Sequence, residues 1–189
     1  MDFLAIATVT SVLRRLLLER VRRDVPGIDV TTVSPAAAGH AATSAGGINV
    51  FLYRVSPSAP LRNRRLPEGS ELGTRAPQMA LDLHYLLSFY GDEAVLEPQR
   101  VLASALTALH AAPVLTGDRL AEALEADPPP FLSGADPAGQ VESITFTIAD
   151  LSLSELCTMW SGLFRTSYVL SMAPDASVIP VASTRAPDH

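Results

Sequence analysis

Alternation of apolar and polar residues is clearest in two stretches that flank a polar loop. Residues 48–55 read Ile-Asn-Val-Phe-Leu-Tyr-Arg-Val, and residues 77–90 place six apolar side chains at every other position. Asp82, His84 and Ser88 lie between those apolar residues. Side chains of a β-strand point alternately to its two faces, so this pattern predicts a strand with one buried and one solvated face. The apolar positions are Met79, Leu81, Leu83, Tyr85, Leu87 and Phe89.

Helical spacing of apolar residues dominates three other regions. Residues 3–23 show a stripe at intervals of three and four, and Pro26 with the following glycine ends it. Residues 94–112 repeat the pattern with Pro98 in the first turn, and residues 117–126 predict a short third helix. The apolar positions are Ile6, Val9, Leu13, Leu16 and Leu17 in the first helix and Val101, Leu102, Ala105, Leu106 and Leu109 in the second.

A capping box marks the start of a fourth helix. Ser152 precedes Glu155 by three residues, so each side chain can bond the other residue's backbone amide. We expect Cys157, Trp160 and Phe164 on the inner face of this helix. Cys157 is then a small buried residue rather than a nucleophile, and Trp160 is a core anchor, with an interface role as the alternative.

Shorter segments predict further strands. The β-branched residues of 28–33 favour one strand, and 141–149 alternates apolar with polar residues. Residues 168–172 and 177–181 predict two more, separated by a turn at Pro174-Asp175.

The order of these elements predicts an α+β (two-layer) fold, with a mostly antiparallel sheet and helices packed mainly on one face. At 189 residues, the chain suits a single domain, which we place at 1–181 with a flexible tail at 182–189. The small, aperiodic residues 34–47 predict a mobile loop, and the proline-rich residues 127–140 predict a surface loop.

Composition excludes several classes of function. The net charge is −6, which argues against general nucleic-acid binding. All 14 basic residues are arginine. Cys157 is the single cysteine, so we expect no internal disulfide and a reducing compartment. No signal peptide and no apolar stretch of ~20 residues is present, so we expect synthesis and assembly in the cytoplasm without membrane insertion.

No motif for a cofactor, a metal or nucleophilic catalysis occurs in the sequence, so we expect no cofactor and no enzymatic activity. His84 and Asp82 share a predicted strand face and could in principle exchange a proton. A small hydrolase that uses this pair is an alternative to a simple surface contact.

Arginines gather between the two long strands. The forked guanidinium of arginine suits bidentate contacts with carboxylates, and the partner could be another copy of this acidic chain. The predicted interface comprises Arg54, Arg62, Asn63, Arg64, Arg65 and Arg75.

Several of these segments, in this order, resemble one known family. They are residues 48–55, Leu61-Arg-Asn63, 81–90, 153–161 and 168–171. The chain resembles the cap, or tail-terminator, proteins of extracellular contractile injection systems, which are phage-tail-like particles. The resemblance implies a non-enzymatic domain that forms a hexameric ring, ends growth of the inner tube and anchors the terminal sheath ring. An assembly adaptor or chaperone is the alternative.

The chain departs from the family pattern at two places. Residues 56–59, Ser-Pro-Ser-Ala, lack an asparagine after the proline. Pro174 interrupts what would be one long final strand, because proline cannot donate to a strand ladder.

Overall fold

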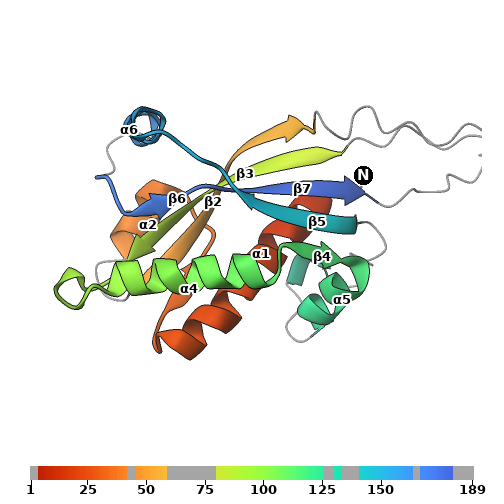
Figure 1. Ribbon diagram of the computed structural model, residues 1–189, viewed down its shortest axis with the longest axis horizontal. Coiled ribbons are helices and arrows are strands. Elements are labelled where there is room, and N and C mark those ends of the chain that lie inside the picture. The colour runs from red at the N-terminus through yellow and green to blue at the C-terminus, as the bar shows by residue number, and fades with distance from the viewer. Residues whose placement is uncertain are drawn as a thin grey trace, which may run out of the picture.

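The structure is a computed structural model that describes residues 4–41, 46–58, 80–125, 130–132, 141–163 and 167–180. Figure 1 shows the arrangement of its elements. The helices are α1 (Ala5–Asp24), α2 (Pro35–Ala41), α4 (Glu97–Ala111), α5 (Gly117–Glu125) and α6 (Leu153–Gly162), with 3₁₀ turns η1 (Glu93–Val95) and η2 (Pro130–Leu132). The strands are β1 (Asp29–Thr31), β2 (Gly47–Pro57), β3 (Leu81–Tyr90), β4 (Val114–Thr116), β5 (Val141–Ile148), β6 (Ser171–Met172) and β7 (Pro174–Pro180).

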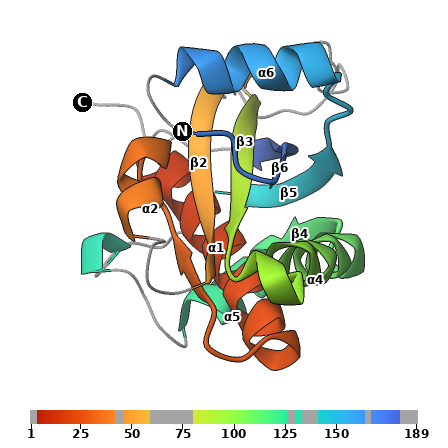
Figure 2. The same ribbon diagram turned by 90° about the vertical axis from the view of Figure 1, so that its left-hand side faces the viewer.

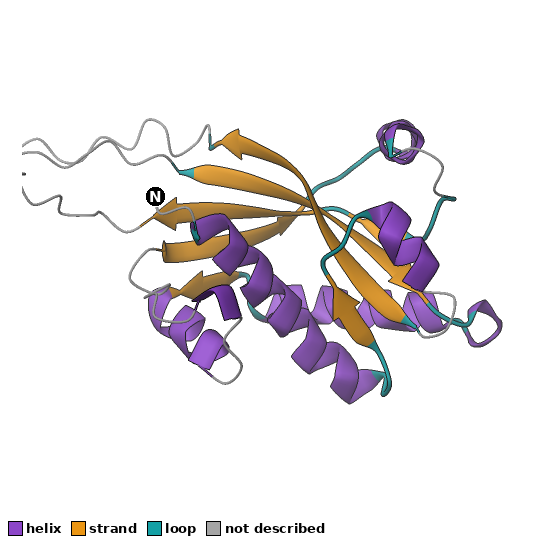
Figure 3. Cartoon of the chain, turned by 180° about the vertical axis from the view of Figure 1, so that it is seen from behind, coloured by secondary structure: helices purple, strands orange, loops and turns teal. Residues whose placement is uncertain are grey.

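The strands form one twisted sheet in the order β1-β2-β3-β7-β5-β4, and β6 also pairs with β3 (Figure 3). Only the pairing of β1 with β2 is parallel among the described strands; the other pairs are antiparallel. Three helices, α1, α4 and α5, lie on one face of this sheet, and α6 lies on the other (Figure 1). The predicted α+β fold with a mostly antiparallel sheet is therefore confirmed.

The main hydrophobic core fills the space between the sheet and the three helices. β3 supplies Leu83, Tyr85 and Leu87 to this core, each with 0% of its surface exposed, and α1 and α4 supply their apolar stripes. Burial of this aliphatic surface is the main driving force for folding. The buried helical residues include Val9, Val12, Leu13, Leu17 and Val21 of α1 and Val101, Ala105, Ala108 and Leu109 of α4.

The outer face of β3 is not solvated along its whole length, in contrast to the prediction. Leu86 and Ser88 are fully buried there, whereas Asp82 and His84 are half-buried. Trp160 of α6 is also buried but stands apart from the main core, and Figure 2 shows α6 crossing above β2 and β3. A second, smaller apolar layer therefore covers one end of this face and leaves the other end polar.

The loop predicted for residues 34–47 is wrong in its first half, because Pro35–Ala41 form α2. The Ser34 hydroxyl accepts a bond from the amide of Ala37, which is the geometry of an N-cap. Proline fits the first helical position, and alanine has the highest helix propensity. Local propensity therefore forms this helix without a periodic apolar stripe.

The turn predicted at Pro174-Asp175 is also wrong. Pro174 is the first residue of β7 and pairs with Ile148, while Asp175 pairs with both His84 and Thr147. Proline lacks an amide hydrogen, but at the first residue of a strand this costs the ladder at most one hydrogen bond. The sequence also predicts an interruption of the final strand at Pro174. The interruption is present one residue earlier, at Ala173, which separates β6 from β7.

Other elements also differ from the prediction, and the strand predicted at 168–172 is reduced to Ser171–Met172. The helix predicted from residue 94 begins at Glu97, because Leu96 adopts a left-handed conformation with φ 54°. Strand β4 was not predicted, since its three residues contain a single buried side chain, Leu115. The predicted tail at 182–189, most of the loop at 127–140, Met79 and Phe164 lie outside the described residues.

Candidate functional site

A hydrogen-bonded chain of three polar side chains crosses the outer face of the sheet. The Nε2 atom of His84 lies 2.8 Å from the Ser56 hydroxyl, and its Nδ1 atom lies 2.8 Å from Asp175 Oδ1. The three residues come from β2, β3 and β7, which are adjacent strands. The side chains of His84 and Asp175 are 18% and 24% exposed. The site is therefore partly shielded but open to solvent.

Asp82 does not contact His84 through a hydrogen bond, so the pairing proposed from the sequence is wrong. Asp82 Oδ1 instead accepts a 2.7 Å bond from the hydroxyl of Ser177 on β7. The two residues lie two apart on β3, where each faces a different residue of the neighbouring strand. Cross-strand neighbours are closer than residues spaced along one strand, so Asp82 bonds its register partner Ser177, whereas Ser56, the partner of Asp82 on β2, contacts His84 diagonally.

A bulge in β2 completes this surface. The register between β2 and β3 shifts between Leu52 and Arg54, so Tyr53 is the extra residue. The Tyr53 ring lies 6.1 Å from the His84 ring, centroid to centroid. Partial burial raises the pKa of the Tyr53 hydroxyl, and the negative charge of Asp175 raises it further. Tyr53 therefore stays neutral beside the imidazole.

Only one member of the predicted arginine interface lies among the described residues. Arg54 is exposed on β2, is the register partner of His84, and forms no hydrogen bond or ion pair with another described residue. Arg62, Asn63, Arg64, Arg65 and Arg75 lie outside the described part of the chain.

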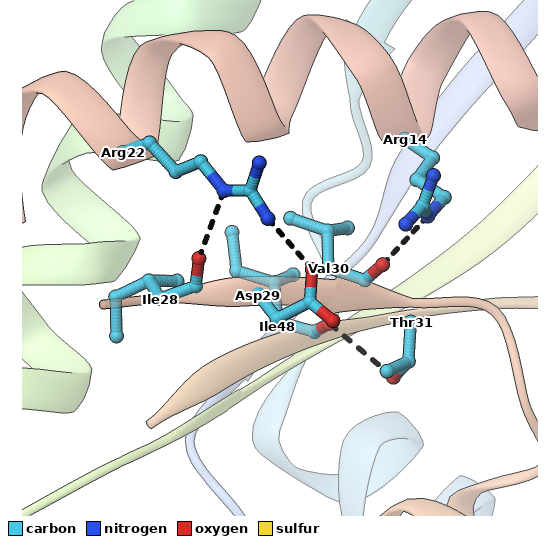
Figure 4. Close-up of polar contacts among 7 residues, drawn as sticks. All are labelled: Arg14, Arg22, Ile28, Asp29, Val30, Thr31 and Ile48. Atoms are coloured by element: carbon cyan, nitrogen blue, oxygen red, sulfur yellow. Dashed lines mark hydrogen bonds and ion pairs between the residues drawn. The ribbon is translucent and has the colours of Figure 1, made fainter. Parts of the chain in front are cut away.

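A second set of arginines, which the sequence analysis did not select, lies along α1. Arg14 Nε donates a 2.7 Å bond to the Val30 carbonyl, and Arg22 Nε donates a 3.4 Å bond to the Ile28 carbonyl (Figure 4). These carbonyls belong to β1 and the residue before it, at one edge of the described sheet. Side chains that bond an edge strand block its pairing with other chains. The spacing of eight residues, about two helical turns, is the sequence signal for this arrangement.

A groove with a volume of about 820 Å³ follows the same side of α1. Its lining combines the apolar side chains of Ile6, Leu18 and Leu52 with Arg14 and Arg22. Arg15 and Glu19 also line it and pair at 2.8 Å, and Arg22 pairs with Asp29 at 3.5 Å. Arg14 is therefore the lining arginine without a carboxylate partner among the described residues.

The residues predicted on the inner face of α6 divide into two groups. Trp160 is 5% exposed and is buried as predicted, but Cys157 is exposed and Leu153 is 74% exposed. Leu156 and Met159 are half-buried and Trp160 is buried, so α6 contacts the rest of the protein along one narrow stripe, and Leu153 and Cys157 lie outside it. The predicted burial of Cys157 is wrong for this reason. The capping box of Ser152 and Glu155 is confirmed.

Within the described ranges, no three metal-binding side chains gather in one place. None of the helices that the structure describes has the length and apolar character needed to cross a membrane.

The family of the chain follows from its sequence. The family model described as the Pvc16 N-terminal domain matches residues 8–189. The chain belongs to this family. The match covers nearly the whole sequence, including all of the described elements after the first turn of α1. A comparison with curated proteins finds no match.

Two solved structures share the fold of this Pvc16 N-terminal domain. One is the sheath/tube terminator of the extracellular contractile injection system PVC in its extended state, with a TM-score of 0.58, 16% identity and 98% of this chain covered. The other is the tube-terminating cap of the anti-feeding prophage, with a TM-score of 0.55, 16% identity and 89% of this chain covered. The family resemblance seen in the sequence is therefore confirmed.

The chain spans 59% and 53% of the lengths of these two solved chains. The shared part corresponds to the sheet and its helices, so the comparison concerns this fold and not the remainder of either relative.

Proposed function

We propose that the protein is a tube and sheath terminator of a contractile injection system. Membership of the Pvc16 N-terminal domain family over residues 8–189 carries this proposal. The fold shared with two terminators of such particles supports it. In this role the protein binds the end of the inner tube, stops its growth and anchors the last ring of the sheath.

The terminator role depends on binding surfaces and requires no chemical step. We propose two surfaces for it: the arginine loop, which comprises Arg54, Arg62, Asn63, Arg64, Arg65 and Arg75, and the α1 groove lined by Arg14 and Arg22. Both concentrate positive charge on a chain whose net charge is −6. Opposite charges guide partners together and favour one orientation of the complex.

We further propose that six copies form a closed ring. Head-to-tail contacts between different surfaces generate a ring when the rotation closes. An arginine surface on one copy and an acidic surface on the next provide such a contact. The α1 arginines block one edge of the described sheet, so we expect neighbours to contact side chains rather than to extend the sheet.

The decisive experiment is to assemble the particle with and without this protein. With the protein, we expect tubes of uniform length that carry extra density at one end in electron microscopy. Without it, we expect tubes of variable length and loss of the sheath from that end. Normal particles that lack the protein in their final form would support a transient adaptor or chaperone instead.

A further inference from the structure

We propose that Ser56, His84 and Asp175 form a nucleophilic site that reacts with small acyl esters. The proposal rests on the two 2.8 Å contacts that link the serine hydroxyl to imidazole and imidazole to carboxylate. A serine activated by a histidine, which a carboxylate holds in place, is the arrangement that many unrelated hydrolases share. This site is independent of the proposed terminator role.

The contact with Asp175 defines the proton on one imidazole nitrogen, and in a neutral ring this also defines the direction of the contact with Ser56. A carboxylate only accepts hydrogen bonds, so His84 Nδ1 carries the proton that is donated to Asp175. In the neutral imidazole, Nε2 is then an acceptor, and the Ser56 hydroxyl donates to it. This is the protonation state in which a histidine can remove a proton from serine.

The sheet holds the three residues in place. Asp175 is the register partner of His84 on β7, and Asp82, two residues away, is bonded to Ser177. Because both carboxylates have their own partners, the imidazole has a single carboxylate to orient it. The Tyr53 ring lies against one side of the imidazole and limits its rotation.

The reaction follows from this geometry. Ser56 Oγ forms a bond to the carbonyl carbon of the ester while its proton passes to His84 Nε2. The bond from that carbon to the leaving oxygen then breaks, and the leaving alcohol takes the proton from Nε2. Water repeats the two steps on the acyl-serine, releases the acid and restores the hydroxyl of Ser56. Asp175 is a positioning residue throughout.

A positive charge lies next to the site on β2, at Arg54. This residue pairs with His84 across the ladder, is exposed and has no partner among the described residues. Its charge also acts on the neighbouring Tyr53, whose hydroxyl pKa it lowers, and at this position it would stabilise the negative charge that develops on the ester oxygen.

The test is to treat the folded protein with an alkyl fluorophosphonate, which labels activated serines, and to find the modified residue by mass spectrometry. We expect labelling at Ser56 and its loss in Ser56→Ala. Removing the general base in His84→Gln should slow labelling by about 100-fold. Asp175→Asn should also slow it.

Asp82 and Ser177 lie in the same row of the ladder as Ser56 and offer matched controls. Ser177 is bonded to the carboxylate of Asp82 without a histidine, so Ser177→Ala and Asp82→Asn should label at the native rate. Circular dichroism of each variant checks that the fold is retained, and release of p-nitrophenol from p-nitrophenyl acetate provides a second readout. Labelling of Ser56 no faster than that of Ser177, or an unchanged rate in His84→Gln, would overturn the proposal and leave the three residues as a structural link between strands.

Discussion

Trp160 packs edge-on against Tyr168, with ring centroids 5.9 Å apart and ring planes at 66°. The contact connects α6 to the segment that leads into β6. An edge-to-face arrangement of two aromatic rings adds about 0.5–1.5 kcal/mol to the effect of burial alone. The contact therefore helps to hold α6 against the segment before β6, while the burial of Trp160 contributes most of the stability.

Replacing Trp160 with alanine should destabilise the fold by roughly 3–5 kcal/mol, because it leaves a cavity at a buried position. Chemical denaturation followed by circular dichroism measures this loss. Tyr168→Ala should cost much less, because Tyr168 is 57% exposed. If Trp160→Ala unfolds at the same denaturant concentration as the native protein but no longer assembles, the prediction is wrong and Trp160 is an interface residue.

The capping box should make stability depend on pH below the ordinary range of a glutamate. Hydrogen bonds from the Ser152 hydroxyl and amide lower the pKa of Glu155 from its usual 4.5. A carboxylate with a lowered pKa stabilises the fold at pH values above 4.5, and this contribution is lost as the pH falls through the lower value in the folded protein. Thermal unfolding of native protein and Glu155→Gln should therefore differ at pH 7 and converge only as the pH falls well below 4.5.

The control for the capping box is Glu142→Gln on β5, which replaces an exposed glutamate with no described partner. It should leave the transition temperature unchanged at neutral pH. Ser152→Ala, which removes the cap itself, should cost about 1 kcal/mol. An equal effect of both glutamate substitutions would contradict a specific role for Glu155.

The Tyr85 hydroxyl should contribute one modest hydrogen bond to the core. It lies 2.9 Å from Thr10 Oγ1, which itself donates to the Ile6 carbonyl, so Tyr85 is the donor. Burial strongly raises the pKa of Tyr85, which keeps it neutral. Tyr85→Phe should cost about 1 kcal/mol and Leu87→Ala about 2–5 kcal/mol in urea denaturation. A larger loss for Tyr85→Phe than for Leu87→Ala would contradict this account.

The sequence predicts elements well where a pattern extends over several turns or strand positions. The long helix α1, the strands β2 and β3 and the cap of α6 all have such a signal. α2 and β4 do not, because one depends on a capped run of alanines and the other on a single buried side chain. The burial of Cys157 was mispredicted because the buried stripe of α6, which comprises Leu156, Met159 and Trp160, is narrower than helical spacing alone indicates.

The polar site shows a different limit. Asp82 and His84 are close in sequence, and this proximity suggested that they pair. The actual partner, Asp175, is 91 residues from His84, and Ser56 is 28 residues away on the other side. These contacts depend on the order and register of the strands, which a single sequence does not define. The role of the arginine loop stays a prediction, since most of its residues lie outside the described part of the chain.

Replacing Arg62, Arg64 and Arg65 together with glutamine should leave the monomer folded but weaken assembly, most strongly at low salt, where the contacts are least screened. Each exposed ion pair contributes only about 0–1 kcal/mol, but a ring repeats each contact, so the losses accumulate. Salt screens such contacts over ~10 Å at 0.1 M. Sedimentation velocity with and without tube protein measures the effect.

The matched control replaces Arg23, Arg100 and Arg119, which are exposed on α1, α4 and α5, with glutamine. It removes the same charge from surfaces with no proposed role and should assemble normally. Equal weakening by both triple variants would mean that net charge, and not the arginine loop, governs assembly.

The central claim is that this protein occupies the end of a tube and sheath assembly. Its most direct test is electron microscopy of assembled particles in which this protein alone carries a gold label. We predict label at one end of each particle, in six-fold symmetric density that closes the tube. Label along the sheath, or none on the purified particle, would contradict the claim.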